Sequence, residues 1–175
     1  MKMNNGKKLS VMILACGSLF SSLCSANSVN IDINGTVVAS PCVVNGSQSS
    51  LQVKLGDTIQ ADSLAASGSL TSWSDFTLAL TSCPASTSSF SVTFSGDADS
   101  DVPANYKNTG TATNLSLELT TADGATTLSN GTALNNVAIP NTHAYNLAMR
   151  ARAVSKGNVM PGSIIGQVQA TFTYQ

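Results

Sequence analysis

The sequence predicts a single antiparallel β-sandwich, and three observations favour this fold class. Apolar and polar residues alternate with a period of two along much of the chain. The alternating runs are separated by turn-forming pairs such as Asn45-Gly46, Asp123-Gly124 and Asn130-Gly131. No segment has a sustained helical period, and 175 residues suit one domain of ordinary size.

Seven or so short strands are expected, each with one apolar face, as is typical of antiparallel sheets. The first places Val29, Ile31, Ile33, Gly35 and Val37 on one face. The others, in chain order, span Leu51–Leu55, Phe76–Leu80, Phe90–Phe94, Leu115–Leu119, Leu147–Ala153 and Ile164–Tyr174. At most one helical turn is expected, between residues 63 and 72.

The composition excludes several function classes. Charged residues make up only 10% of the sequence and the formal net charge is −1, so there is no basic track for nucleic acid. There are 26 serines and 18 threonines, which give a surface of uncharged hydroxyls. Hydrophobic residues reach 42%, which argues against intrinsic disorder.

The N-terminus is interpreted as a secretory signal peptide over residues 1–26. Lys2, Lys7 and Lys8 precede an apolar run of about 15 residues, which is too short to span a bilayer. Small residues, Ser25 and Ala26, follow at the expected cleavage site. Lipidation of Cys16 is the alternative interpretation of this segment.

Cleavage after Ala26 leaves two cysteines, Cys42 and Cys83. In the oxidising compartment to which a signal peptide leads, two remaining cysteines usually pair. A Cys42–Cys83 disulfide is therefore expected, with a pair of buried free thiols as the alternative.

Two features do not fit a self-contained sandwich. The first alternating run lies at the mature N-terminus, before the first cysteine, and has the pattern of a detachable strand. The last run ends at the final residue, Gln175, so no later strand is left to pair with its outer edge.

No constellation of catalytic or cofactor-binding residues was found. His143 is the only histidine, and no serine lies in a G-x-S-x-G motif. Asp97, Asp99 and Asp101 have the spacing of a calcium loop, but Val102 and Asn108 stand where Gly and Glu are needed. These acids are interpreted as a solvated acidic turn, and no metal, cofactor or enzymatic activity is expected.

Several stretches together resemble the chaperone–usher pilins, the subunits of bacterial adhesive fimbriae. They are Asn34–Cys42, Leu80–Pro84, Phe94–Asp99 and Tyr106–Leu119. The C-terminus adds a glycine fourteenth from the end, alternating apolar residues and a penultimate tyrosine: Gly162, Ile164, Val168, Ala170, Phe172 and Tyr174. Within the family, the sequence is most similar to minor tip-adaptor subunits of type 1 pili.

The resemblance implies an incomplete immunoglobulin-like sandwich that lacks its last strand. Residues 39–175 would form the pilin domain, and Gly162–Tyr174 would border an open groove. Residues 27–38 would be an extension that donates a strand to a neighbouring subunit, with Gly35 filling a shallow position. The implied partners are a periplasmic chaperone, an outer-membrane usher and neighbouring subunits that include an adhesin, with no nucleic acid.

The expected function is therefore that of a structural subunit of a cell-surface fimbria, secreted through the periplasm. A major shaft subunit is the first alternative. A fimbrial subunit that itself binds a host ligand is the second.

Overall fold

The computed structural model describes residues 29–175. The protein divides into two units, residues 1–36 and residues 37–175, which are described separately. The signal peptide expected over residues 1–26, with Cys16, lies outside the described residues, as do Asn27 and Ser28. No helix among the described residues is long and apolar enough to cross a membrane.

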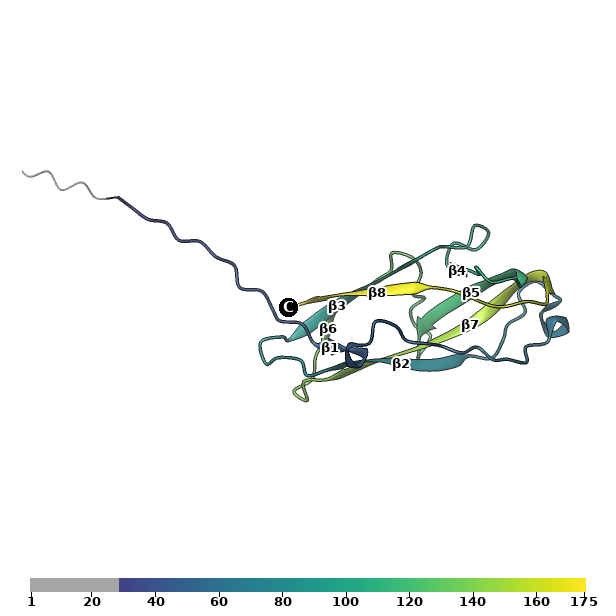
Figure 1. Ribbon diagram of the computed structural model, residues 1–175, viewed down its shortest axis with the longest axis horizontal. Coiled ribbons are helices and arrows are strands. Elements are labelled where there is room, and N and C mark those ends of the chain that lie inside the picture. The colour runs from purple at the N-terminus through teal and green to yellow at the C-terminus, as the bar shows by residue number, and fades with distance from the viewer. Residues whose placement is uncertain (1–28) are drawn as a thin grey trace, which may run out of the picture. The chain divides into compact units, whose positions relative to one another are not determined.

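Strands are the main regular secondary structure of the second unit, and they form two antiparallel sheets (Figure 1). One sheet has five strands in the order β1-β2-β7-β5-β4. Their bounds are Val43–Val44, Ser74–Thr81, Tyr145–Met160, Thr113–Thr121 and Tyr106–Lys107. The other sheet has the order β6-β3-β8, with bounds Ala133–Ala138, Ser89–Gly96 and Val168–Tyr174.

The main core lies between the sheets, and the alternation in the sequence determines which side chains fill it. On β3, Phe90, Val92 and Phe94 are buried, whereas Thr93 between them is exposed. Facing residues of the other sheet include Leu80 and Leu147, which are also buried. The expected all-β, sandwich-like architecture is confirmed.

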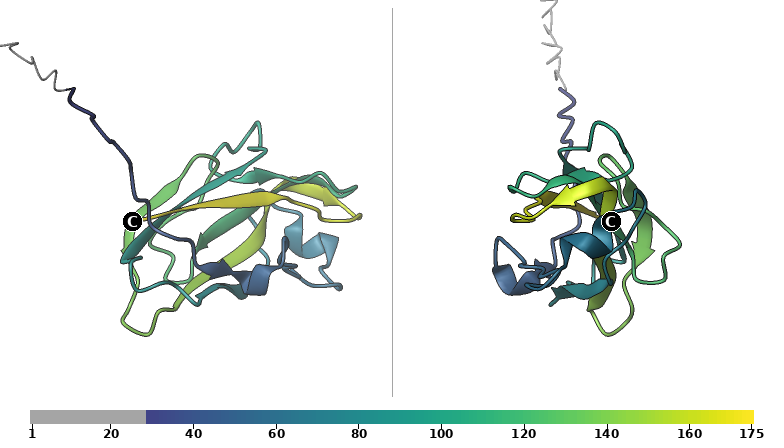
Figure 2. Two further views of the ribbon diagram at one scale, coloured as in Figure 1. Left: turned by 60° about the vertical axis from the view of Figure 1, so that its left-hand side comes forward. Right: turned by 90° about the vertical axis from the view of Figure 1, so that its right-hand side faces the viewer.

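The connection between β1 and β2 carries two short 3₁₀ turns, η1 (Asn45–Ser47) and η2 (Ala61–Leu64) (Figure 2). The second packs against β7, and its Leu64 is buried in a small second core with Leu115 and Val159. Only the last two residues of η2 fall within the expected range 63–72, and η1 was not expected.

Strand β6 was not expected, and a bulge explains why. Its inward side chains are Leu134 and Val137, which are three positions apart rather than two. The pairing with β3 shifts register between Phe90 and Val92, and Asn136 has a positive φ of 52°. The extra residue breaks the period-two pattern by which a strand is found in a sequence.

The expected disulfide is present and joins Cys42 to Cys83. Cys42 immediately precedes β1, and Cys83 follows the end of β2 by two residues. Since β1 and β2 are hydrogen-bonded neighbours, the bond fixes the start of the domain to the five-stranded sheet.

Candidate functional site

A groove of about 1640 Å³ opens between the two sheets. Its floor is formed by apolar side chains from both sheets. These include Phe76, Leu78, Phe94, Tyr106, Leu115, Leu117, Leu119 and Met149. Most of these side chains are themselves buried and Phe76 and Leu117 are half-buried, so the groove reaches down to the core between the sheets.

Strand β8 forms one wall of the groove and is an edge strand. It pairs with β3 from Val168 to Tyr174, and no described strand pairs with its other side. Ala170, Phe172 and Tyr174 are half-buried and point inward, while the threonines between them are exposed. A row of unpaired backbone N–H and C=O groups beside apolar side chains is a template for another strand.

The opposite wall is the stretch from Gln48 to Ile59. The sequence predicted a strand at Leu51–Leu55, but the structure has none there. Val53 and Leu55 still alternate with exposed neighbours and line the groove. Residues 49–59 make no backbone-to-backbone hydrogen bond within the described part of the protein. The stretch therefore has the side-chain pattern of a strand without a hydrogen-bonded neighbour among the described residues.

Near one end of the groove, residues 162–165 are held by hydrogen bonds to residues 108–112. Asn108 lies at the centre of these contacts: its Nδ2 donates to the Ala112 carbonyl at 2.7 Å, and its Oδ1 accepts from the Ile165 N–H at 2.8 Å. A Cβ on Gly162 would collide with the backbone of Thr111 and Ala112. Gly162 is thus required by close packing. The strand expected from Ile164 begins only at Val168, because Ser163 and Ile165 hydrogen-bond to residues 109–112 instead of β3.

The structure brings five of the six expected groove residues together. Gly162, Ile164, Val168, Ala170 and Phe172 line the groove. Tyr174 lies beyond its end, where it stacks on Phe172 with ring centroids 6.4 Å apart. Burial raises the pKa of the Tyr174 hydroxyl, and a hydrogen bond with the backbone of Cys42 partly offsets this rise.

Sequence reasoning missed Tyr106 as a groove residue. Its side chain is 2% exposed, and its hydroxyl has no hydrogen-bond partner among the described residues. Burial raises the pKa of Tyr106 to about 12, so the hydroxyl is neutral. The only local signal was an aromatic residue in a two-residue strand, which has no period to detect.

The expected donor residues, unlike the groove residues, are almost fully exposed. Val29, Ile31 and Ile33 are 81%, 82% and 91% exposed, and Val37 is 99% exposed. A Cβ added to Gly35 would meet nothing within 4 Å. These large apolar side chains, at alternate positions, are not covered by any of the described residues.

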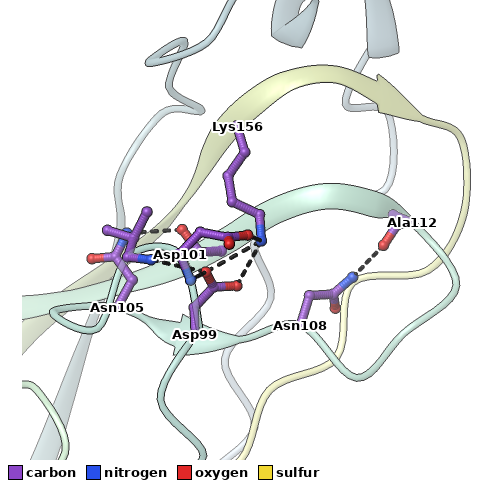
Figure 3. A network of polar contacts seen from close by, with 8 residues as sticks. Asp99, Asp101, Asn105, Asn108, Ala112 and Lys156 are labelled. Atoms are coloured by element: carbon purple, nitrogen blue, oxygen red, sulfur yellow. Dashed lines mark hydrogen bonds and ion pairs between the residues drawn. The ribbon is translucent and has the colours of Figure 1, made fainter.

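The expectation that Asp97, Asp99 and Asp101 form a solvated acidic turn was only partly correct. Asp101 is exposed, but Asp99 is 4% exposed, and both accept hydrogen bonds from Lys156 Nζ at 2.8–3.2 Å (Figure 3). The residues between 29 and 175 include no cluster that could hold a metal ion. The arrangement is an ion-pair network that ties the β3–β4 connection to β7.

The network gives the domain a measurable acid sensitivity. Burial raises the pKa of Asp99, but hydrogen bonds from Lys156 and from the N–H groups of Asp101 and Val102 outweigh it and leave the pKa below 3.8. The resulting stability is present above pH 3.8 and decreases as the pH falls below that value.

We expect Lys156→Met to lower the free energy of unfolding by about 2–3 kcal/mol at pH 7, because Asp99 loses its charged donor. The difference in the free energy of unfolding between the variant and the unmodified protein should shrink below pH 3. Urea unfolding at pH 7 and below pH 3 measures this difference. Lys107→Met is the matched control, since Lys107 is exposed. Equal losses in both variants would show that the network contributes no stability.

His143 is an exposed residue in the connection between β6 and β7. Its N–H donates to the Pro140 carbonyl and its own carbonyl accepts from the Cys83 N–H, so its backbone shapes the loop.

The sequence profile of the fimbrial protein family matches residues 31–175. The chain belongs to this family. It is 36% identical to protein FimG of Escherichia coli K12 over 168 residues, covering 95% of this chain and 97% of FimG. It is 35% identical to the S-fimbrial adhesin protein SfaS of E. coli O6:K15:H31, covering 95% and 99% of the two proteins.

The fold has matches among solved structures. The P pilus rod subunit PapA superposes with a TM-score of 0.66 at 15% identity, covering 78% of this chain and all of PapA. The resemblance to chaperone–usher pilins and the incomplete immunoglobulin-like fold are thus confirmed. The protein is a structural subunit of surface fimbriae and not an enzyme.

Proposed function

We propose that this fimbrial subunit joins two neighbours by strand exchange. Its groove receives a strand from one neighbour, and its residues 27–38 supply the missing strand to the other. The proposal is carried by one observation: the same polypeptide has an open apolar groove and a segment whose alternate apolar side chains are exposed.

The two surfaces match in geometry. An extended segment places Val29, Ile31, Ile33 and Val37 on one side, at every second position. A strand added beside β8 would hydrogen-bond along its free edge and insert alternate side chains into the groove. Gly35 would occupy a position where the groove accepts no side chain.

Burial and ordering oppose one another in this exchange. Each buried apolar side chain contributes roughly 1.5–3 kcal/mol. Ordering the backbone costs about 1–2 kcal/mol per residue over some ten residues. The persistence of the assembled fibre therefore depends on slow dissociation as much as on affinity.

Before assembly, the groove needs a cover, because exposed apolar clefts beside an edge strand aggregate. A periplasmic chaperone that lends a strand would supply it, and an outer-membrane usher would exchange that strand for a subunit's extension. The same requirement predicts that the isolated subunit self-associates.

Within the fibre, the proposed place is that of a minor tip adaptor next to an adhesin. The similarity to FimG over nearly the whole of both proteins supports it. The similarity to SfaS, a protein named as an adhesin, favours a subunit that itself binds a host ligand as the second candidate. A shaft subunit would differ in location, so gold-labelled antibody should mark fibre tips for an adaptor and whole fibres for a shaft subunit.

Deletion of residues 27–37 tests the exchange itself. The deleted variant should still be captured by the chaperone, because its own groove is intact, but it should fail to attach to the preceding subunit. Fimbriae sheared from cells and analysed by immunoblot report the outcome. Asp32→Ala, on the outward face, is the control and should assemble normally. If the deletion unfolds the subunit within the chaperone complex, residues 27–38 are a core strand of their own domain.

A further inference from the structure

The described residues include three Asn-Gly pairs, and their surroundings differ sharply. Asn-Gly is the dipeptide most prone to spontaneous deamidation, because glycine leaves the following backbone nitrogen sterically free. That nitrogen attacks Cγ of asparagine, the carbonyl carbon of its amide. A bond forms between the nitrogen and Cγ, the bond from Cγ to Nδ2 breaks, and ammonia leaves with the transferred proton. Water then opens the succinimide to aspartate or to isoaspartate.

The pair Asn130-Gly131 is protected by two hydrogen bonds. Asn130 Oδ1 accepts from the Gly96 N–H at 3.2 Å, which fixes the asparagine amide. The Gly131 N–H, whose nitrogen would be the nucleophile, donates to the Phe94 carbonyl at 2.8 Å. Both bonds must open before the succinimide can form.

The pair Asn45-Gly46 is protected in part. Asn45 Nδ2, the leaving group of the reaction, donates to the Ser50 carbonyl at 3.0 Å. The Gly46 nitrogen makes no backbone hydrogen bond within residues 29–175.

The pair Asn34-Gly35 has neither form of protection within its own unit. Residues 29–36 have no assigned helix or strand, both members of the pair are exposed, and no hydrogen bond within that range involves them. The two residues belong to the triplet Asn34-Gly35-Thr36, which repeats the triplet Asn130-Gly131-Thr132. The same local sequence thus occurs once in a hydrogen-bonded turn and once in an extended segment.

We propose that Asn34 is a site of spontaneous deamidation in the unassembled subunit, and that its isoaspartate product can no longer be assembled. The second half of this proposal rests on the donor role of residues 27–38. Isoaspartate routes the backbone through Cβ and so adds one backbone atom between Ile33 and Gly35. The added atom puts Val37 out of phase with Ile33, in the way that a register slip turns a strand's side chains to the wrong face. Ordinary aspartate at position 34 lies on the outward face and leaves the alternation intact.

The chemistry is tested on the whole mature protein in its complex with the chaperone, which covers the groove and leaves the extension free, with each asparagine followed by peptide mass spectrometry. After incubation at pH 8 and 37 °C, Asn34 should gain the deamidation mass at least about tenfold faster than Asn130, with Asn45 between them, because hydrogen bonds at the other two sites must open first. In 8 M urea the rates at Asn34 and Asn130 should converge, since their triplets are identical. Equal native rates at these two residues would overturn the proposed modification.

The effect of isoaspartate at position 34 on assembly is tested on cells. Isoaspartate at position 34 should be detectable in the unassembled periplasmic pool and depleted at least about tenfold in sheared fimbriae, because a strand out of phase loses its apolar contacts. An Asn34→Asp variant should assemble like the unmodified protein, whereas Asn34→Gln should assemble and resist the modification.

The outcomes separate the two parts of the proposal. Equal isoaspartate in pool and fibre, together with normal assembly of the variant lacking residues 27–37, would overturn the donor role. Equal isoaspartate with failed assembly of that deletion would leave the donor role standing and overturn only the effect of the modification. An absence of deamidation in the pool would overturn the proposed site.

Discussion

Replacing Phe172 by aspartate is expected to abolish capture of this subunit by a donor strand. Phe172 lies on the inner face of β8, lines the groove and packs against Phe90 with ring centroids 5.7 Å apart. A carboxylate there would be buried without a partner when the groove is filled, at a cost of several kcal/mol. Co-purification with a tagged chaperone, followed by recovery in fimbriae, measures the loss.

Two further variants separate loss of capture from loss of folding. Thr173→Asp places the same charge on the exposed face of the same strand and should be captured normally. Val168→Asp changes a side chain that is 39% exposed in the open groove, so the domain itself should tolerate it while strand capture fails. Normal capture of both Phe172→Asp and Val168→Asp would rule out β8 as the acceptor edge.

Removal of the disulfide is expected to have the second large effect. The bond closes a sequence separation of 41 residues, for which loop entropy gives a stabilisation of about 4 kcal/mol. A domain with an open groove has a small core, so the double change of Cys42 and Cys83 to alanine should greatly reduce the amount of subunit that reaches fimbriae.

The chemical state of the bond can be checked directly. Intact mass with and without reductant, after alkylation, should show no free thiol in the unreduced mature protein. A change of Cys16, which would be removed with the signal peptide, should leave fimbrial yield unchanged and serves as the control. Yields as high for the double variant as for the unmodified protein would show that strand pairing alone secures the start of the domain.

The strands that face both a core and solvent could be predicted from the sequence, because burial on one face imposes the period of two. Phe90, Val92 and Phe94 show this most clearly. Leu51–Leu55 has the same pattern yet no strand, because a ladder requires a hydrogen-bonded neighbour and none of the described residues supplies one. Under the proposed exchange, the sequence carries the side-chain pattern of the assembled subunit, whereas the structure shows the subunit without a donated strand.

Other features depend on contacts between distant residues and leave no local pattern. Tyr106 lines the groove because β4 lies beside β5, and Asp99 is buried because a lysine 57 positions later reaches it. Neither position could be inferred from the residues around it. The C-terminal wall of the groove was found because its residues are contiguous in one strand and match the pilin pattern.

The location of the disulfide determines which part of the subunit bears load in a fibre under tension. If residues 27–38 donate a strand as proposed, a pulling force that arrives through them reaches Cys42, crosses the sulfur–sulfur bond to Cys83 and enters β3 at Ser89. From β3 it passes through the β3–β8 ladder to the strand held in the groove. Residues 43–82, which include the groove wall opposite β8, lie inside the closed loop and are bypassed. The disulfide therefore prevents a pulling force on the fibre from separating β1 from β2 and unfolding that wall. The contact between the subunits is then loaded in shear along the length of β8.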